Sequence, residues 1–368
     1  MDSVLSCMVT DNLGPGSLSD RLIQLLREHL QCAGGIVLRE RSRALAVALA
    51  HLNLEPGSSI AIDPLAPWYY DALIRSSGLV PHYVDLADDA LVVDTEALKA
   101  LVANPAEGDG HSDVPVPDTL TAILLTAHCG YLPDLTAIDE LGVPVIEDVT
   151  EGIGSHDGRN GAGSIGRFVI VGMEPDAMVT SGGGTALLAR SRGDRNSLRH
   201  EQEQLPSDAL LSDMNAALGI TQVRDLEKYV RRRAEIADAY RNAAMRGRHR
   251  VPVQAGDGEN AWPGFPVMID GSVPDVVAYA RKKGVEAAPA FRDSVIGRYG
   301  RAAREAHVPD ADDPAVQAHD TESTAQIIDE ERYPNARKAL LRCVLFPLYP
   351  SLTGKEVSTI ERVIASLP

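Results

Sequence analysis

Short apolar runs alternate with helical segments through the first half of the chain, and this alternation constrains the fold most. Runs such as 122–126 (AILLT) and 168–171 (FVIV) lack a polar face, which is typical of strands buried in a parallel sheet. The expected strands are 36–38, 59–62, 82–84, 122–126, 143–147, 168–171 and 186–189, with helices at 42–52, 69–77 and 95–102. This order predicts an α/β fold, a mostly parallel mixed sheet flanked by helices.

The second half of the chain has a different pattern. A long helical segment covers 212–246, and the arginines 231–233 within it are expected on a solvated face. The expected elements after it are a strand at 265–269, a helix at 274–283, an acidic irregular stretch at 309–331 and a helix at 354–366. Residues 104–119, rich in Pro, Gly and Asp, are expected to form a surface loop. We therefore predict a large domain over 1–240 and a small C-terminal α+β domain over 241–368.

The charge and the cysteines exclude several classes of protein. A formal net charge of -17 disfavours nucleic acid and anionic membranes, because both would repel the chain at long range. No apolar run approaches a membrane span, and residues 1–13 lack the features of a secretory signal. The cysteines Cys7, Cys32, Cys129 and Cys343 form no CxxC pair and no metal-ligand spacing. We expect a cytoplasmic protein with reduced thiols, no metal, and no nucleic-acid or membrane partner.

Seven segments carry, in order, a resemblance to a known family. They are GPGSL (14–18), ALAVALAHLNLEPGSSIAI (44–62), VPHYVD (80–85), TAHCGYLPDLTAI (126–138), VPVIEDVTEGIGS (143–155), MNAALGITQVRDLEKYVRRRAEIADAY (214–240) and YPNARKALLRCVLFPLYPSLTGKEV (333–357). Together they resemble the DegT/DnrJ/EryC1/StrS sugar aminotransferases. These are pyridoxal phosphate (PLP) enzymes with the fold type I of aspartate aminotransferase. The resemblance spans nearly the whole chain and is weakest over 243–329.

The resemblance implies a cofactor site, and Asp148 is its clearest survivor. Asp148 matches the aspartate that pairs with the pyridine nitrogen of PLP, although an Asp at a strand end can also simply cap the next turn. The family's Ser-Gly-Thr phosphate cradle corresponds to Glu40, Arg41 and Ser42, which places a carboxylate where a dianion would bind. Asp148 and Ser42 are thus the expected vestiges of cofactor binding.

The family's Schiff-base lysine is the central loss. In GMEPDAMVTSGGGTALL (172–188), alignment on the proline puts Ala177 at the lysine, and alignment on the glycines puts Asp176 there. No lysine occurs between Lys99 and Lys228, so the loss does not depend on the alignment. Without this ε-amine the chain cannot form the internal Schiff base and lacks the base that moves the substrate proton.

Three further positions correspond to contacts of the family's active site, and residues at two of them have changed. Glu151 replaces a glutamine beside the 3-oxygen of the ring, which a carboxylate would repel. His128 matches a family histidine, although a lone His after a strand is more often a structural hydrogen-bonder. Asp208 and Leu210 replace the Asn and Arg that reach across the family's dimer. The resemblance still implies a homodimer, since loss of a site need not remove the apolar interface.

The segment GAGSIG (161–166) spells GxGxxG but has the wrong context for a dinucleotide site. A turn precedes it and a strand is expected after it, whereas a dinucleotide loop leaves a strand and opens a helix. We interpret it as a glycine-rich hairpin.

Three functions stay open. The first is a degenerate family member without transaminase activity, a pseudoenzyme that binds a sugar, a nucleotide sugar or a protein partner. The second is a PLP-independent enzyme acting on an activated sugar, with acid–base groups from His128, Asp148, Glu151 and His156. The third is an aminotransferase that holds PLP noncovalently. We rank them in this order. We therefore expect no bound cofactor, and we leave open whether the chain is an enzyme of polysaccharide or amino-sugar biosynthesis.

The state of the site discriminates between the first two functions. An open pocket lined by His128, Asp148 and Glu151 would favour the enzyme. A pocket filled by side chains such as Arg41 or Trp68 would favour the pseudoenzyme.

Overall fold

The computed structural model describes residues 2–9, 14–103, 120–254, 256–300 and 328–368. The expected surface loop at 104–119 lies outside these residues, as does most of the expected acidic stretch at 309–331.

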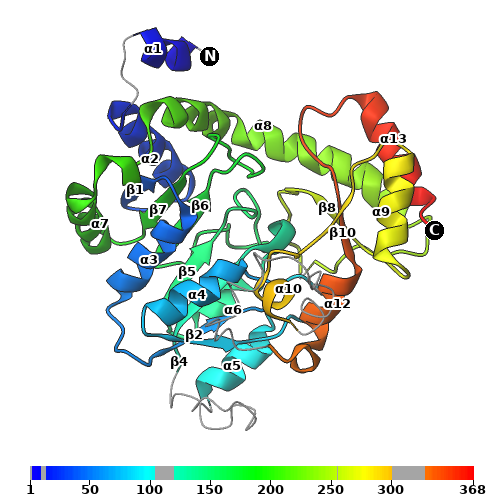
Figure 1. Ribbon diagram of the computed structural model, residues 1–368, viewed down its shortest axis with the longest axis horizontal. Helices are drawn as coiled ribbons and strands as arrows, with labels where there is room; N and C mark the ends of the chain where they lie inside the picture. The colour runs from blue at the N-terminus through cyan, green and yellow to red at the C-terminus, as the bar shows by residue number, and fades with distance from the viewer. Residues whose placement is uncertain (1, 10–13, 104–119, 255, 301–327) are drawn as a thin grey trace, which may run out of the picture.

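A seven-stranded mixed sheet forms the centre of the larger part of the molecule (Figure 1). Its order is β1-β7-β6-β5-β4-β2-β3, with bounds β1 Gly34–Leu38, β2 Ser59–Ile62, β3 Val80–Tyr83, β4 Leu120–Thr126, β5 Val145–Asp148, β6 Phe168–Gly172 and β7 Thr185–Ala189. Strands β3, β2, β4, β5 and β6 are parallel neighbours, and β7 is antiparallel to both β6 and β1. The expected mostly parallel mixed sheet is confirmed.

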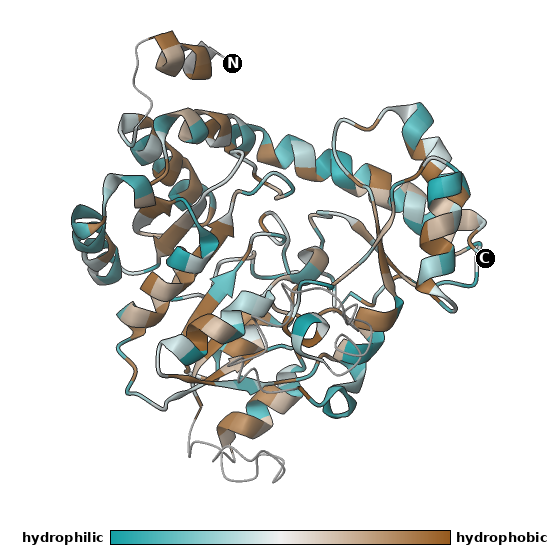
Figure 2. Cartoon of the chain, viewed as in Figure 1, coloured by the Kyte–Doolittle hydropathy of each residue, from teal (hydrophilic) through white to brown (hydrophobic). Residues whose placement is uncertain are grey.

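Helices cover both faces of this sheet, because its strands are apolar on both sides. The bounds are α2 Ser17–His29, α3 Arg41–Leu52, α4 Trp68–Ser76, α5 Thr95–Ala103, α6 Leu135–Asp139 and α7 Arg192–Gln204, whereas α1 Asp2–Val9 lies away from the sheet. Two separate apolar clusters, one containing Leu125 and Val171 and the other Leu124 and Ile170, lie on opposite faces of the strands. Figure 2 shows the contrast between the apolar strands and the hydrophilic α7.

A smaller sheet lies at the other end of the molecule. Its order is β8-β10-β9, with β8 Phe265–Met268, β9 Ala288–Pro289 and β10 Cys343–Phe346, all antiparallel neighbours. The helices beside it are α9 Val273–Lys282, α12 Pro334–Arg342 and α13 Gly354–Ala365, and α10 Val295–Tyr299 packs between α4 and α12. A capping box at Thr353 and Glu356 begins α13, where the side chain of each residue bonds the backbone N–H of the other.

Helix α8, Asp213–Ala244, joins the two sheets and runs along the top of both in Figure 1. Ser212 caps its start by accepting a hydrogen bond from the Asn215 N–H. Val223 and Leu226 belong to an apolar cluster of the large sheet, whereas Ile236 and Tyr240 belong to that of the small sheet. Because one continuous helix serves both cores, a domain boundary near residue 240 stays a prediction. No described helix is long and apolar enough to cross a membrane.

Candidate functional site

Asp148 lies at the carboxyl end of β5, buried at 2% exposure. One carboxylate oxygen, Oδ1, accepts hydrogen bonds from the Thr150 N–H at 3.0 Å and the Thr150 hydroxyl at 2.5 Å. The Thr150 hydroxyl also accepts the Gly172 N–H at 2.8 Å. This chain of bonds fixes Asp148 against the ends of β5 and β6, so the carboxylate does more than cap its own turn.

The outer oxygen of Asp148 is also occupied from within the chain. The Tyr70 hydroxyl, on α4, donates to Oδ2 at 2.6 Å, and Arg41 Nη1, at the start of α3, lies 3.4 Å away. Tyr70 is fully buried. Burial, together with the Asp148 charge, raises the pKa of Tyr70 well above its usual value, so the hydroxyl stays a donor. All four bonds therefore point at one carboxylate from inside the fold.

Arg41 bridges Asp148 to a second carboxylate. Its Nε lies 3.0 Å from Glu174, just after β6. Burial by itself would lower the pKa of Arg41, but the charges of Asp148 and its neighbours raise it above the ordinary value. The site thus contains a half-buried cation between two acids. Trp68, in contrast, packs edge-on against Tyr69 and Tyr299 and makes no recorded contact with Asp148.

The side chains of Glu40, Arg41 and Ser42, aligned with the family's phosphate cradle, contact other groups of the chain. Ser42 donates its hydroxyl to Glu40 at 3.3 Å, and the Glu40 side chain is exposed. The end of β6 is crowded nearby, because a Cβ on Gly172 would collide with the Glu174 carboxylate and come within 2.8 Å of the Thr150 hydroxyl oxygen. Any side chain at 172 would therefore disturb the groups around Asp148.

His128 is a buried partner of Asp63. It lies in a short turn after β4, where its Nε2 is 2.6 Å from Asp63 Oδ1 and its ring contacts Phe291 edge-on. Burial lowers the pKa of His128, but the carboxylates of Asp63, Glu151 and Asp148 together outweigh it, so the pKa is raised and the charged ring is favoured. The contact with Asp63 is the one expected if His128 has a structural hydrogen-bonding role. A catalytic role for His128 stays a prediction.

The remaining acid–base candidates, Glu151 and His156, have hydrogen-bond or ion-pair partners of their own. Glu151 accepts a 2.6 Å hydrogen bond from the Cys129 N–H. His156 lies 3.4 Å from the exposed Glu259. Asp208 and Leu210 stand where the family has the Asn and Arg that reach across its dimer. Asp208 is exposed, and the backbone of Leu210 forms an antiparallel bridge to Leu38 of β1.

The GAGSIG segment surrounds an internal carboxylate. Glu147, 1% exposed, accepts hydrogen bonds from the backbone N–H groups of Gly163, Ile165 and Gly166. The hairpin interpretation fits this arrangement, in which backbone donors that could hold a phosphate instead hold a side chain of the preceding strand.

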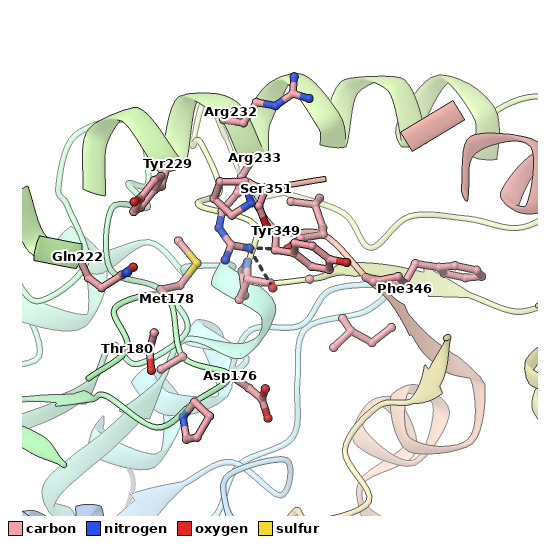
Figure 3. Close-up of a pocket in the computed structure, with 18 of the residues that line it drawn as sticks. Asp176, Met178, Thr180, Gln222, Tyr229, Arg232, Arg233, Phe346, Tyr349 and Ser351 are labelled. Atoms are coloured by element: carbon pink, nitrogen blue, oxygen red, sulfur yellow. Dashed lines mark hydrogen bonds between the residues drawn. The ribbon is translucent and has the colours of Figure 1, made fainter. Parts of the chain in front are cut away.

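The two positions aligned with the family lysine, Asp176 and Ala177, line a pocket between the two sheets that Asp148 does not line. It has a volume of about 700 Å³, and Asp176 and Ala177 form part of one wall. Tyr229 and Arg233 of α8 lie above it in Figure 3, whereas the Arg232 head group points away from it and pairs with Glu235 at 2.9 Å. The sequence alone did not identify this pocket, because its walls come from segments far apart in the chain. We name it the α8 pocket.

Arg233 is the unexpected residue of the α8 pocket. It was expected on a solvated face, but it is buried at 7% exposure, so that prediction was wrong for this arginine. Its Nη1 donates to the carbonyls of Trp262, Pro263 and Leu348, and its Nε has no hydrogen-bond partner. Burial lowers the pKa of Arg233 to about 10. Arg233 makes no ion pair with any of the described residues. The packing of α8 against the small sheet buried this side chain, which helical periodicity could not foresee.

Comparisons with known proteins agree on one family. The model of the DegT/DnrJ/EryC1/StrS aminotransferase family matches residues 1–317. EpsN of Bacillus subtilis is 23% identical over 75% of this chain and 74% of that protein. The spore coat polysaccharide biosynthesis protein SpsC of the same organism is 23% identical over 98% of this chain and 93% of that protein. The crystal structure of Spr1654 from Streptococcus pneumoniae, in its PLP form, superposes with TM-score 0.79 at 15% identity, covering 99% and 94% of the two chains.

These comparisons contradict the expectation that no cofactor is bound, because the family and its solved members point to PLP. We based the expectation on the loss of individual side-chain contacts. A cofactor site also depends on how strands and helix ends are arranged, and the fold retains that arrangement. As the side chains stand, they do not fit PLP. Tyr70 and Arg41 occupy the Asp148 oxygen that would meet the ring, and Ala177 offers no amine. Arg41 would have to leave Asp148 first, and we derive no reaction step through PLP.

The matched family model, curated relatives that cover most of the chain, and the fold superposition agree with the ordered segments quoted from the sequence. The chain therefore belongs to the DegT/DnrJ/EryC1/StrS aminotransferase family.

Proposed function

We propose that this chain is a sugar aminotransferase homologue that binds an activated sugar without transaminating it, within polysaccharide or amino-sugar biosynthesis. The observation that carries the proposal is the state of Asp148. Its carboxylate is bonded to Thr150, Tyr70 and Arg41, and the lysine-equivalent positions hold Ala177 or Asp176. The chain thus offers neither a free partner for the ring nitrogen nor an amine for a Schiff base.

Neither alternative has comparable support. A PLP-independent acid–base enzyme would need free groups, but His128 and Glu151 are already engaged by Asp63 and Cys129. An aminotransferase with noncovalently held PLP would need Arg41 to vacate Asp148. The relative SpsC is named as a polysaccharide biosynthesis protein. This name supports both the place in polysaccharide biosynthesis and the sugar ligand.

Amino transfer to the cofactor is the decisive test. Purified protein with added PLP is incubated with an L-amino-acid donor, and the absorbance change from PLP to its amino form is followed. A family member that retains the lysine is assayed alongside as the positive control. We expect no transfer above that of free PLP. Saturable transfer that disappears in Asp148→Asn would overturn the proposal.

We also propose that the chain is a homodimer. Apolar side chains remain exposed on α1 and on the first turns of α8, namely Leu5, Met8, Val9, Met214 and Leu218. A second copy would cover this surface, since exposed apolar patches of this kind mark interfaces. Light scattering should give twice the 39.4 kDa chain mass, and a mass of one chain would refute the dimer. The cytoplasmic location stays a prediction.

A further inference from the structure

We propose that the groove along the outer edge of β1, between α2 and α7, docks an extended acidic segment of a partner protein as an added strand. The groove has a volume of about 530 Å³, and the backbone of residues 33–35 and side chains of both helices line it. It shares no lining residue with the α8 pocket and none of the partners of Asp148, so the docking does not depend on the proposed sugar ligand.

The outer edge of β1 is only partly paired. β1 is the last strand of the large sheet, and β7 occupies its inner edge. At the outer edge, the Arg39 N–H donates to the Ala209 carbonyl at 3.0 Å. The Leu211 N–H donates to the Val37 carbonyl at 3.3 Å. Every second residue of a strand faces the same neighbour, so the backbone of Gly35 also points outward, where no described residue bonds to it. A free edge of this kind is a template for another strand.

Two glycines shape the floor of the groove. A Cβ on Gly34 would come within 2.8 Å of the Arg195 side chain, and a Cβ on Gly35 would collide with the Leu187 carbonyl. The backbone edge is therefore reached without a side chain of its own in the way. At about 3.3 Å per residue, residues 33–35 offer about 10 Å of edge, which suits a short docked segment.

The two walls of the groove lie on opposite faces of the sheet (Figure 1). Leu22 of α2 packs in the apolar cluster that contains Leu125, whereas Leu198 of α7 packs in the cluster that contains Leu124. Side chains of a docked strand would point alternately to these two faces. Adjacent residues of the partner segment would thus reach different walls, the first at α2 and the next at α7.

Three arginines on these walls favour a carboxylate ligand. Arg27 of α2 and Arg195 and Arg199 of α7 line the groove, and none of them makes an ion pair with any described residue. Arg195 bonds the side-chain carbonyl of Asn196, at 2.8 Å. Two adjacent carboxylates on the docked segment would meet Arg27 on one wall and the α7 arginines on the other, in charge-assisted hydrogen bonds.

The acids of the groove lie toward its opposite end. Asp20 is in the first turn of α2 and Glu203 in the last turn of α7, whereas α2 ends and α7 begins near the start of β1. Both acids are exposed and can remain in water. The groove therefore favours a segment with its carboxylates at one end. The net charge of -17 is no obstacle at contact, because salt at about 0.15 M screens charges beyond about 8 Å.

Fluorescence anisotropy of labelled peptides, titrated with the full-length protein, tests the docking. The probe is the capped peptide Thr-Glu-Glu-Val-Thr-Val-Thr. One comparison peptide has Gln-Gln in place of Glu-Glu, and another has N-methyl groups on its three central residues, which removes their backbone donors. We expect saturable binding of the probe that weakens as salt rises, at least about tenfold weaker binding of the Gln-Gln peptide, and no binding of the N-methylated one.

Arginine variants locate the binding to the groove. Arg27→Gln with Arg199→Gln should weaken binding of the probe at least about tenfold, by loss of charge from both walls. Arg21→Gln with Arg192→Gln removes the same charge from exposed positions of the same two helices outside the groove. This control pair should change the affinity less than about twofold. The unfolding midpoint of each variant is measured to confirm folding.

Hydrogen exchange separates strand pairing from simple charge attraction. The Gly35 amide should exchange more slowly with the probe bound, and at an unchanged rate with the N-methylated peptide. Gln202→Trp, which fills the groove, should abolish both binding and protection, whereas Gln204→Trp, exposed on α7 outside the groove, should leave both unchanged.

Four results would overturn the docking: equal affinity for the probe and the Gln-Gln peptide, equal weakening by the two arginine pairs, unchanged exchange at Gly35 with the probe bound, or free glutamate binding as tightly as the probe. The last would mean a site for small anions. Loss of dimer mass in the Arg27, Arg199 pair would also overturn it, because a second copy would then occupy the groove. Transaminase activity would refute the proposed function and leave the docking standing.

Discussion

The Asp148 site and the α8 pocket contrast in how their charges are compensated. At Asp148, each carboxylate oxygen meets donors from the chain, and Arg41 adds a cation that also contacts Glu174. In the α8 pocket, Arg233 is buried among carbonyl dipoles without a recorded ion pair. The Asp148 carboxylate is bonded within the chain, whereas Arg233 of the α8 pocket makes no ion pair with any of the described residues.

This difference shows why a site must be judged by what its residues contact. The sequence resemblance assigns Asp148 to the family's cofactor site, yet in the structure its hydrogen-bonding capacity is used within the fold. Arg233 was assigned no role in the site from the sequence, yet it is buried in the wall of the α8 pocket. Burial and hydrogen-bond partners therefore describe each group better than its aligned position does.

The largest effect should come from removing the carboxylate at the closed site. Asp148→Ala leaves the buried Tyr70 hydroxyl and both Thr150 donors without their acceptor. We expect the free energy of unfolding to fall by about 3 kcal/mol. Urea titration measures it, with the exposed Asp176→Ala as the control, expected within about 0.5 kcal/mol of wild type. Equal small losses in both variants would show that Asp148 is not structurally engaged.

Removing the buried cation should cost somewhat less. Arg233→Met leaves the carbonyls of Trp262, Pro263 and Leu348 without their donor but also removes a charge that is costly to bury. We expect a loss of about 2 kcal/mol in urea titration. Arg232→Met, whose head group is more exposed, is the matched control and should lose less than about 1 kcal/mol. A greater loss in the control would contradict the structural role of Arg233.

Freeing Asp148 should raise the affinity for PLP. Arg41→Ala removes the cation that stands at the outer carboxylate oxygen, and we expect PLP to bind about tenfold more tightly, equivalent to about 1.4 kcal/mol. Absorbance titration measures the affinity. Arg43→Ala removes the same charge from an exposed position two residues along α3 and should leave it unchanged. If the two variants behave alike, Arg41 does not obstruct the site.

The smallest effect should be the pH dependence contributed by His128. Its pKa is raised in the folded state, so its stabilising contribution is complete below the unfolded value of 6.5 and is lost as pH rises through the folded value. The stability advantage of wild type over His128→Gln should therefore shrink as pH rises from 6.5. Urea titrations across this range measure the difference. A constant or growing advantage would mean that His128 is neutral when paired with Asp63.

Local pattern was enough for most elements of the large sheet. Strand 59–62 was predicted to the residue, and the helix predicted at 42–52 begins only one residue earlier, at Arg41. These succeed because apolar periodicity and capping act within one element. Strand β10 at 343–346 was missed as a separate strand, since its identity depends on pairing with β8 and β9.

The sequence by itself determined which side chain is absent from this stretch. A chain without lysine between Lys99 and Lys228 cannot place an ε-amine at 176 or 177, whatever its fold. Tertiary structure alone decided which groups meet. Tyr70 and Arg41 reach Asp148 from 78 and 107 residues away, and Arg233 meets Leu348 from 115. Covalent composition is fixed by the chain, but burial and charge compensation arise only when distant segments pack together.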